Sequence, residues 1–433
     1  MKILRLFEYQ KFYFSELEKL GPRLKDDIRS FDEKHAKSNG GSLIFNWNHK
    51  DYFKATHYVG VVQVGNLCIE ILPKIDNSAI EEQRQFIQSR ENLIYMLSMT
   101  QNLPLLQRDE ASQSFKEENF LEFIIRSYLV NLDKQIRLGI DRKYIYRESN
   151  LKTVKGKLLL TKHLVTNGLT SLNAFVGFDE FSEDTTINRI LKAGCDFILK
   201  FSASSENKLL AKRCVSAFDE VDSAKLGEMD YVKIVYSRNN TRYSILVDFA
   251  WALISKRILN PKAGDNNTFA FVFSMHRLFE EFMANLIKKN AGYFGLSAGQ
   301  IAAQAAGNRR WFMTDKVDPS GRFRLKPDIL ILSNDGNPLI VLDTKWKKLL
   351  ADDEDVKNGV SQGDLYQLFA YAKIFKTSKN ILLYPAVNGT SESSYLPNDG
   401  SFDSIEVRFI DLNRNLKKEK RIIIEELRLI LEI

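Results

Sequence analysis

The sequence predicts a multidomain α/β protein with a β-rich N-terminal module, a largely helical middle region and a C-terminal α/β domain. Three observations predict this class. Apolar residues alternate over residues 58–72, they recur with helical spacing over residues 114–138, and two apolar runs flank the Asp-Gly pair at residues 335–336. With 433 residues, the chain is long enough for several domains with cores of their own. We expect these domains to span residues 1–95, 96–265 and 270–433.

The composition is that of an ordinary globular protein, with 44% hydrophobic and 27% charged residues. No apolar run approaches the roughly 20 residues of a membrane helix, and the N-terminus lacks a signal-peptide core. We therefore expect a cytoplasmic protein without a membrane partner. The three cysteines are scattered and the five histidines form no closely spaced pair, which argues against a disulfide framework and a zinc site.

The N-terminal module is expected to centre on a β-hairpin. Residues 58–72 are typical of two strands that turn at Gly65 and Asn66, and Pro73 closes the second strand. Helical spacing follows over residues 81–101.

The middle region is expected to be mainly helical. Helices are predicted over residues 114–138 and 184–202, the second with Thr185 as a plausible N-cap. Asn239-Asn240 indicates a turn, and residues 261–267 are the clearest linker.

A basic stretch in the middle region is a candidate nucleic-acid surface. The net charge of +7 permits an anionic partner, and the densest basic stretch runs from Arg142 to His163 with two tyrosines interleaved. Such a stretch could track a nucleic-acid backbone; the alternative is a solvated face. The candidate DNA-binding residues here are Arg142, Lys143, Lys152, Lys155, Lys157 and Lys162.

Two strands in the C-terminal domain bring acidic residues together. Residues 325–333 and 338–346 are strands by composition, and Asp-Gly between two apolar runs is a strong hairpin signal. Counting outward from Asp335 and Gly336 as the loop residues places Asp328 directly opposite Asp343.

This acidic pair predicts a metal site. Two carboxylates opposite each other in strands of Ile, Leu and Val repel, and their desolvation is costly. A divalent cation removes this cost, and carboxylate oxygens suit Mg²⁺. We expect Asp328 and Asp343 to hold Mg²⁺, which would activate a scissile phosphate and a water, and Lys345 on the same face to orient that water and stabilise the developing charge. The alternative is an edge hairpin whose acids face water.

Asp328, Asp343 and Lys345 resemble the PD-(D/E)xK nuclease signature. The resemblance implies an acidic residue on the first helix of the domain. Glu280, in a helix predicted over residues 275–289, matches it and would be a third metal ligand. The alternative is an ordinary exposed glutamate.

The resemblance also implies a second helix at the site. Gln367 and Tyr371 lie one turn apart and are similar to a Gln/Tyr helix that lines the active site in these nucleases. Gln367 would then serve the reaction and Tyr371 would contact DNA. The alternative is a helix that only packs on the sheet.

The chain as a whole resembles the McrC family, the nuclease subunits of McrBC-type modification-dependent restriction systems. The resemblance runs from about residue 58 to 385. It implies a partner, the McrB-like AAA+ GTPase ring, which recognises modified DNA and translocates it, while the McrC-like subunit docks on the ring, stimulates GTP hydrolysis and cuts. The stretches that carry it are residues 70–75, 120–126, 146–158, 178–191, 278–280, 326–328, 342–347 and 364–367.

The chain contains no Gly-x4-Gly-Lys-Ser/Thr loop, so we expect GTP to bind the partner and not this chain. Residues 1–95 would be the module that docks on the partner. Two other functions remain open. One is a stand-alone PD-(D/E)xK nuclease in DNA repair or another defence system. The other is a non-catalytic scaffold that regulates an NTPase, against which the intact Asp328, Asp343 and Lys345 argue.

Overall fold

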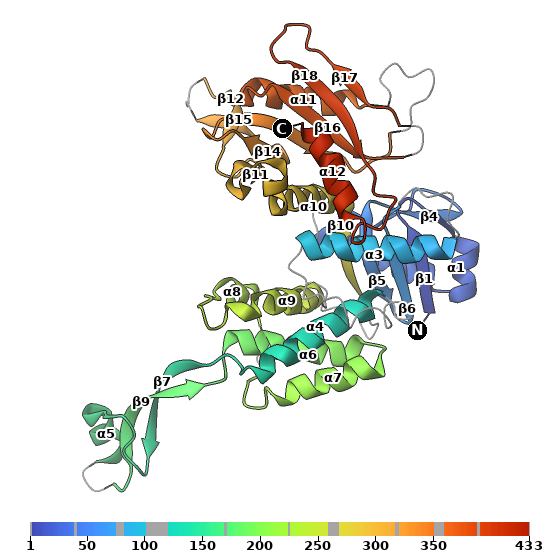
Figure 1. Cartoon of the computed structure of the whole chain (residues 1–433). Coiled ribbons are helices and arrows are strands. Elements are labelled where there is room, and N and C mark those ends of the chain that lie inside the picture. Colours follow the sequence, from blue (N-terminus) through green and yellow to red (C-terminus); the bar gives the residue numbers. More distant parts are fainter. Residues whose placement is uncertain are drawn as a thin grey trace. The chain divides into compact units, whose positions relative to one another are not determined.

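The computed structural model describes residues 2–38, 41–74, 82–100, 120–168, 171–223, 226–258, 268–316, 320–349, 359–387 and 390–432 (Figure 1). It is a mixed α/β protein, as predicted. The chain divides into two compact units, one of Met1–Asn102 with Thr268–Ile433 and the other of Leu103–Asn267. The N-terminal and C-terminal modules, which we expected as separate domains, thus belong to one unit.

The N-terminal part of the first unit is built on a four-stranded sheet in the order β1-β6-β5-β10. β1 (Lys2–Phe7) runs parallel to β6 (Leu67–Leu72), and β6 pairs antiparallel with β5 (Tyr58–Val64). Val64 pairs with Leu67, so the two residues between them form the turn and the predicted hairpin is confirmed. Every residue of β5 and β6 is buried.

The fourth strand of this sheet comes from far along the chain. β10 (Thr268–Ser274) pairs antiparallel with β5, whereas we expected residue 270 to begin the C-terminal domain. An apolar run identifies a buried strand, but its local period does not say which sheet the strand joins. The predicted linker at 261–267 lies outside the described residues.

The N-terminal part also contains helices, two of which, α1 (Phe14–Leu20) and α2 (Leu24–Ser38), lie in the stretch that the sequence predicts as β-rich. α3 (Glu82–Thr100) confirms the helix expected over residues 81–101 and packs against α10 (Met275–Lys289). The other elements are β2 (Lys11–Tyr13), β3 (Phe45–Asn46) and β4 (Tyr52–Ala55), with strand order β2-β4-β3.

The C-terminal part of this unit carries a six-stranded sheet in the order β11-β14-β15-β16-β18-β17. β14 and β15 form an antiparallel hairpin, and β15, β16 and β18 run parallel. The helix α10 has the predicted bounds and contacts β15. The strands are β11 (Ile301–Ala303), β14 (Ile329–Leu332), β15 (Pro338–Thr344), β16 (Lys379–Pro385), β17 (Ser393–Tyr395) and β18 (Ser404–Ile410), and the other helices are α11 (Gln362–Phe375) and α12 (Lys420–Leu431).

The second unit has a helical part that agrees with the prediction. Thr185 caps α6 by accepting a hydrogen bond from the Asn188 amide at 3.3 Å. Residues 114–119 of the predicted first helix lie outside the described residues. The helices are α4 (Phe120–Arg137), α6 (Thr186–Phe201), α7 (Ser205–Ser216), α8 (Glu228–Val232) and α9 (Ser244–Ile258).

The same unit includes a small sheet in the order β7-β9-β8, formed by β7 (Lys143–Leu151), β8 (Lys157–Leu158) and β9 (Ala174–Ser182) with α5 (Leu160–Asn167). In Figure 1 this sheet extends away from the helices of the unit. Among the described residues of the whole chain, no helix is both long and apolar enough to span a bilayer.

Candidate active site

The β14–β15 hairpin places Asp328 and Asp343 beside each other. Ile329 pairs with Leu342, so the next positions outward are those of the two aspartates, as the sequence predicts. The turn differs from the expected two-residue loop. The Gly336 amide donates to the Ser333 carbonyl, Gly336 has φ +79°, and the register shifts by one residue near the turn. This is a three-residue turn whose glycine takes the left-handed conformation.

Asp328 is a half-buried carboxylate held by the neighbouring strand. Its Oδ2 accepts hydrogen bonds from the Thr344 amide at 2.7 Å and the Thr344 hydroxyl at 2.8 Å. Burial, together with the charges of Asp343 and Glu280, raises the pKa of Asp328 to about 7. Asp328 therefore changes its protonation state near neutral pH.

Asp343 is still more buried, with 1% of its surface exposed. Burial raises the pKa of Asp343, and the ammonium of Lys345, whose Nζ lies 2.5 Å from Oδ2, opposes this effect. Asp343 Oδ1 accepts no hydrogen bond from any described residue. A buried carboxylate oxygen without a donor is costly, and a cation would relieve that cost.

Lys345 is fixed by groups from two elements. Besides its ion pair with Asp343, its Nζ donates to Gln367 Oε1 at 3.0 Å, and Asp364 Oδ1 lies 4.0 Å away. Burial alone would lower the pKa of Lys345, but the surrounding carboxylates raise it above its ordinary value. The side chain is therefore a positioned, protonated cation. Asp364, which also pairs with Lys347, is a member of the site that sequence reasoning did not single out.

Gln367 and Tyr371 extend a chain of hydrogen bonds from Lys345. Gln367 Nε2 donates to the Tyr371 hydroxyl at 2.8 Å, and that hydroxyl donates to the Lys326 carbonyl at 3.2 Å. The structure thus brings Gln367 to the site. Tyr371 is only 5% exposed, so its hydroxyl serves this internal chain, whereas the predicted contact with DNA would require an exposed side chain.

Glu280 reaches the site from α10 with the help of a residue that sequence reasoning missed. Gln304 Nε2 donates to Glu280 Oε1 at 2.8 Å, and the Gln304 amide donates to the Asp328 carbonyl at 2.8 Å. Gln304 has φ +49°, a conformation that is uncommon outside glycine. Burial, and to a lesser extent the charge of Asp343, raises the pKa of Glu280. No local pattern marks Gln304, because its partners lie on other elements.

The two aspartates fit a divalent cation. The buried, unpartnered Oδ1 of Asp343 and the hard oxygens of both carboxylates suit Mg²⁺, which commonly takes one or two carboxylates and completes its shell with water and substrate phosphate. Among the described residues, no three His, Cys, Asp or Glu side chains lie close enough to hold a metal by themselves. The predicted set of three ligands, with Glu280 beside the aspartates, is therefore not assembled in this structure.

The predicted basic stretch lies on the small sheet and α5 of the second unit. Three of its bases pair with acids, Arg142 with Glu183, Arg147 with Glu180 and Lys162 with Glu148. Strand β9 and the residues that follow it supply acids that a count over residues 142–163 does not include. The stretch is therefore not a continuous basic face.

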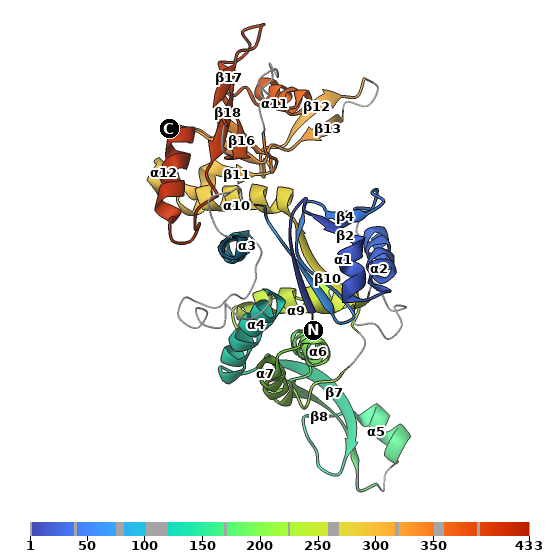
Figure 2. The ribbon, with the colours of Figure 1, turned by 90° about the vertical axis from the view of Figure 1, so that its right-hand side faces the viewer.

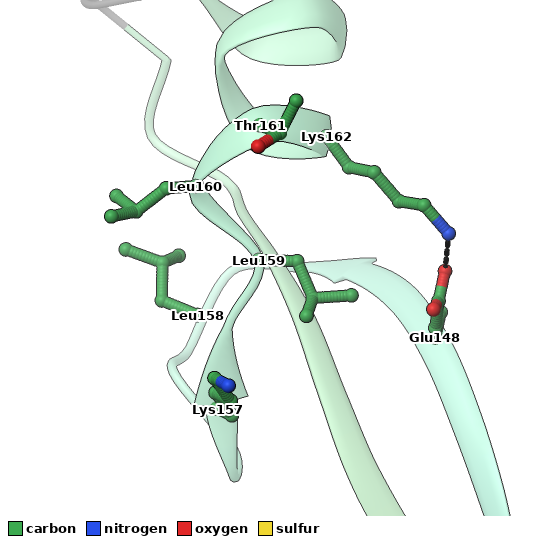
Figure 3. A pocket seen from close by; sticks show the side chains of 7 residues that line it. All are labelled: Glu148, Lys157, Leu158, Leu159, Leu160, Thr161 and Lys162. Atoms are coloured by element: carbon green, nitrogen blue, oxygen red, sulfur yellow. Dashed lines mark hydrogen bonds and ion pairs between the residues drawn. The ribbon is translucent and has the colours of Figure 1, made fainter.

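The remaining candidates are distributed around the same sheet. Lys155 Nζ lies 4.2 Å from the centroid of the Phe178 ring, while Lys143, Lys152 and Lys157 form no ion pair with described residues. Figure 3 shows a hollow near the start of α5, lined by Glu148, Lys157, Leu158, Leu159, Leu160, Thr161 and Lys162.

One comparison with known proteins identifies a family. The family model of the McrBC 5-methylcytosine restriction system component matches residues 53–385. No curated protein matches the chain. A chain in the refined half-complex from the tetradecameric assembly of Thermococcus gammatolerans McrB AAA+ hexamers with bound McrC is 18% identical, with a TM-score of 0.65 over 98% of this chain and 100% of that chain. A chain in the cryo-EM structure of the Thermococcus gammatolerans McrBC complex is 21% identical, with a TM-score of 0.50 over 67% of this chain and 88% of that chain. At these identities the likeness to the solved structures shows a shared fold.

Proposed function

Because the chain belongs to the family of McrBC 5-methylcytosine restriction system components, we propose that it is the McrC-like, Mg²⁺-dependent DNA endonuclease subunit of such a system. The observation that carries the proposal is the half-buried Asp328 beside the buried Asp343, with the cation of Lys345 alongside. The arrangement follows the PD-(D/E)xK pattern, on a hairpin whose register was predictable. The reaction would be hydrolysis of a phosphodiester bond without a covalent intermediate.

Each residue of the site would have its own role in this reaction. Asp328 and Asp343 would hold Mg²⁺, which when bound polarises the scissile phosphate and lowers the pKa of a water. Lys345, protonated and fixed by Asp343 and Gln367, can donate hydrogen bonds to the attacking water and to the charge that develops on the phosphate. Glu280, held by Gln304, adds negative charge near the aspartates and can orient water there.

The partner of the chain would be a McrB-like AAA+ GTPase ring. The solved half-complex contains McrB AAA+ hexamers with bound McrC, and one of its chains shares the fold of this protein. We extend that assembly to this chain. The partner would bind GTP, and this chain would cut DNA and, as its second role, stimulate hydrolysis of the GTP. Residues 1–95 were the docking module expected from the sequence.

The second unit offers another docking surface for the same partner. Large apolar side chains are exposed on its small sheet, on α5 and beside them, whereas solvent normally meets polar residues there. The bases around them are partly paired with acids, which favours a protein partner over DNA. The exposed apolar residues are Tyr144, Tyr146, Val154, Leu160, Leu164, Val165, Leu172 and Phe181.

Copurification with an AAA+ GTPase encoded nearby, followed by cleavage assays, tests the proposal. We expect methylated DNA to be cut in the presence of GTP, Mg²⁺ and both proteins, and unmodified DNA to be spared. Asp343→Ala should abolish cleavage and leave stimulation of the GTPase intact. Cleavage without any GTPase would favour the stand-alone nuclease, and stimulation without any cleavage would favour the regulatory scaffold.

The docking surface is tested in the same assays. Val165→Asp together with Leu160→Asp should weaken stimulation of the GTPase if the second unit docks, because two charges would enter an apolar interface. If this variant still stimulates the GTPase fully, the second unit does not dock, and residues 1–95 remain the candidate docking module. Both side chains are exposed, so the variant should fold like the wild type, and the circular dichroism spectrum checks this.

A further inference from the structure

A two-stranded ribbon stands directly before the acidic pair. β12 (Arg310–Thr314) and β13 (Gly321–Leu325) pair antiparallel and form a sheet of their own. β13 ends three residues before Asp328. Figure 2 shows the ribbon projecting from the C-terminal part of the first unit beside α11. A ribbon of this kind contributes little to a core, so its side chains call for another explanation.

The ribbon exposes large apolar side chains to solvent. Four such side chains lie on β12 and β13, and each would leave water only if another molecule covered it. Exposed apolar clusters of this kind mark binding surfaces. One of them, Phe323, has φ +57°, which is an outlier for a bulky residue. The exposed fractions are 44% for Trp311, 42% for Phe312, 51% for Met313 and 74% for Phe323.

The ribbon and its flanks are also basic. Residues 309–326 include six Lys or Arg and two Asp in the sequence. Arg322 pairs with Asp315 at 3.9 Å, but Arg324 Nε has no acceptor among the described residues. On the small sheet of the second unit, by contrast, the bases lie among acids. The basic residues of the ribbon region are Arg309, Arg310, Lys316, Arg322, Arg324 and Lys326.

The base of the ribbon is tied to the candidate active site. Lys326 follows β13, and its carbonyl accepts the hydrogen bond from Tyr371 that ends the chain starting at Lys345. A ligand held by the ribbon would therefore be positioned relative to Lys345. Gly321 permits the compact form of the ribbon, since a Cβ there would lie 2.2 Å from Cγ of Trp311.

We propose that the β12–β13 ribbon binds the DNA duplex beside the scissile phosphate, with its arginines on backbone phosphates and its exposed aromatic rings against bases. This inference rests on the proposed nuclease function, because it assigns a binding element to that substrate. A two-stranded ribbon fits the major groove of B-DNA, apolar side chains can wedge between base steps, and arginines supply the charge that attracts the backbone. The ribbon combines all three features within a few residues of Asp328.

Salt-dependent binding tests the arginines. The full-length Arg310→Gln, Arg322→Gln double variant is titrated with a fluorescent DNA duplex, without Mg²⁺, at several salt concentrations. Loss of two phosphate contacts should reduce the slope of log K against log salt by about 1.8. The matched control is Arg29→Gln with Arg428→Gln, which removes the same charge from exposed arginines on α2 and α12 and should leave the slope unchanged.

Phe323→Gly tests the aromatic contact without the risk of a folding defect. Glycine accepts the positive φ of this position, so the melting temperature should stay the same or rise. Loss of a ring that stacks on bases should weaken DNA binding roughly tenfold. Leu429→Ala on α12 removes an exposed apolar side chain elsewhere and should bind DNA like the wild type.

The outcomes separate this inference from the nuclease proposal. Reduced slope and weaker binding in the ribbon variants support the inference, even if cleavage is never seen, because binding is read by fluorescence anisotropy alone. Wild-type binding by both ribbon variants, or no DNA binding by the wild type at low salt, overturns it. Unchanged DNA binding with lost stimulation of the partner GTPase overturns it as well and assigns the ribbon to a protein interface.

Discussion

The indole Nε1–H of Trp346 donates to both carboxylate oxygens of Glu8, at 3.2 Å to Oε1 and 3.0 Å to Oε2. Glu8 is buried at the end of β1, whereas Trp346 directly follows Lys345. The Trp346 ring also packs on Phe279, with 5.3 Å between the ring centroids, and Phe279 precedes Glu280 on α10. Trp346 thus joins the N-terminal part to α10 and to the segment after β15, two of the elements that carry the candidate active site.

Glu8→Gln is expected to flatten the dependence of stability on pH. Burial raises the pKa of Glu8 from 4.5 to about 8, and hydrogen bonds from Trp346 and the Lys74 amide partly oppose this. Between these two values the folded state binds more protons at this position than the unfolded state, so the stability from this group is full below 4.5 and is lost as pH rises to about 8. Melting temperatures at pH 5, 7 and 9 should therefore fall less in the variant than in the wild type.

The control for this experiment is Glu16→Gln, which removes an exposed carboxylate from α1 of the same module. It should follow the wild type at all three pH values. If Glu8→Gln also follows the wild type between pH 5 and 9, the buried carboxylate is not the titrating group. The neutral amide of glutamine leaves a buried N–H without an acceptor, so the comparison rests on the pH trend and not on one absolute temperature.

Asp343→Asn is expected to exchange activity for stability. Removing a buried negative charge should raise the stability of the metal-free protein at pH 8 by about 1–3 kcal/mol. The same change should lower Mg²⁺ affinity and reduce cleavage at least about 10³-fold, because it removes a metal ligand and the partner of Lys345. Melting curves with and without Mg²⁺ at pH 8 check both effects. Mg²⁺ should stabilise the wild type and leave the variant unchanged.

Asp335→Asn is the matched control, since it makes the same change at an exposed position of the β14–β15 turn. It should retain cleavage and the stabilisation by Mg²⁺. A metal-free Asp343→Asn protein that is clearly less stable than the wild type would mean that the ion pair with Lys345 outweighs the cost of burying the charge.

Lys345→Ala should slow the chemical step far more than it weakens metal binding. Lys345 would donate hydrogen bonds to the attacking water and to the charge that develops on the phosphate, and it would not bind the cation. Single-turnover rates at saturating Mg²⁺ should therefore fall roughly 10²–10³-fold. Gln367→Ala should cost less, about tenfold, because Lys345 loses one hydrogen-bond acceptor but keeps its ion pair with Asp343. Equal losses in both variants would show that Lys345 acts mainly through its contact with Gln367.

The acidic pair was predictable because local patterns determine it. Alternating apolar residues and an Asp-Gly turn are enough to set the register, and one residue of slip would have put every side chain on the opposite face. The turn itself took a third residue, yet the shift near Leu332 restored the predicted pairing of Ile329 with Leu342. The pairing that mattered for the aspartates was therefore correct although the turn was not.

Several contacts around the site join distant segments, and a single sequence does not reveal them. Glu8 and Trp346 are separated by 338 positions. Gln304 donates to Glu280 from a backbone with positive φ, and a glutamine in the sequence does not indicate such a conformation. The acidic neighbours of the Arg142 region escape a local count in the same way, because they lie on or just after the paired strand β9.

Gln304→Gly is expected to uncouple Glu280 from the aspartates without disturbing the fold. Glycine adopts the φ of +49° freely, and its amide can still donate to the Asp328 carbonyl, so the melting temperature should hold. Glu280 loses the donor that holds it, so cleavage at subsaturating Mg²⁺ should fall about tenfold, whereas saturating Mg²⁺ should restore much of the rate. Ala305→Gly is the matched control, because Ala305 has the same φ of +49° and no polar side chain, and it should cut like the wild type. A Gln304→Gly protein that needs no more Mg²⁺ than this control would show that Glu280 is positioned by α10 alone.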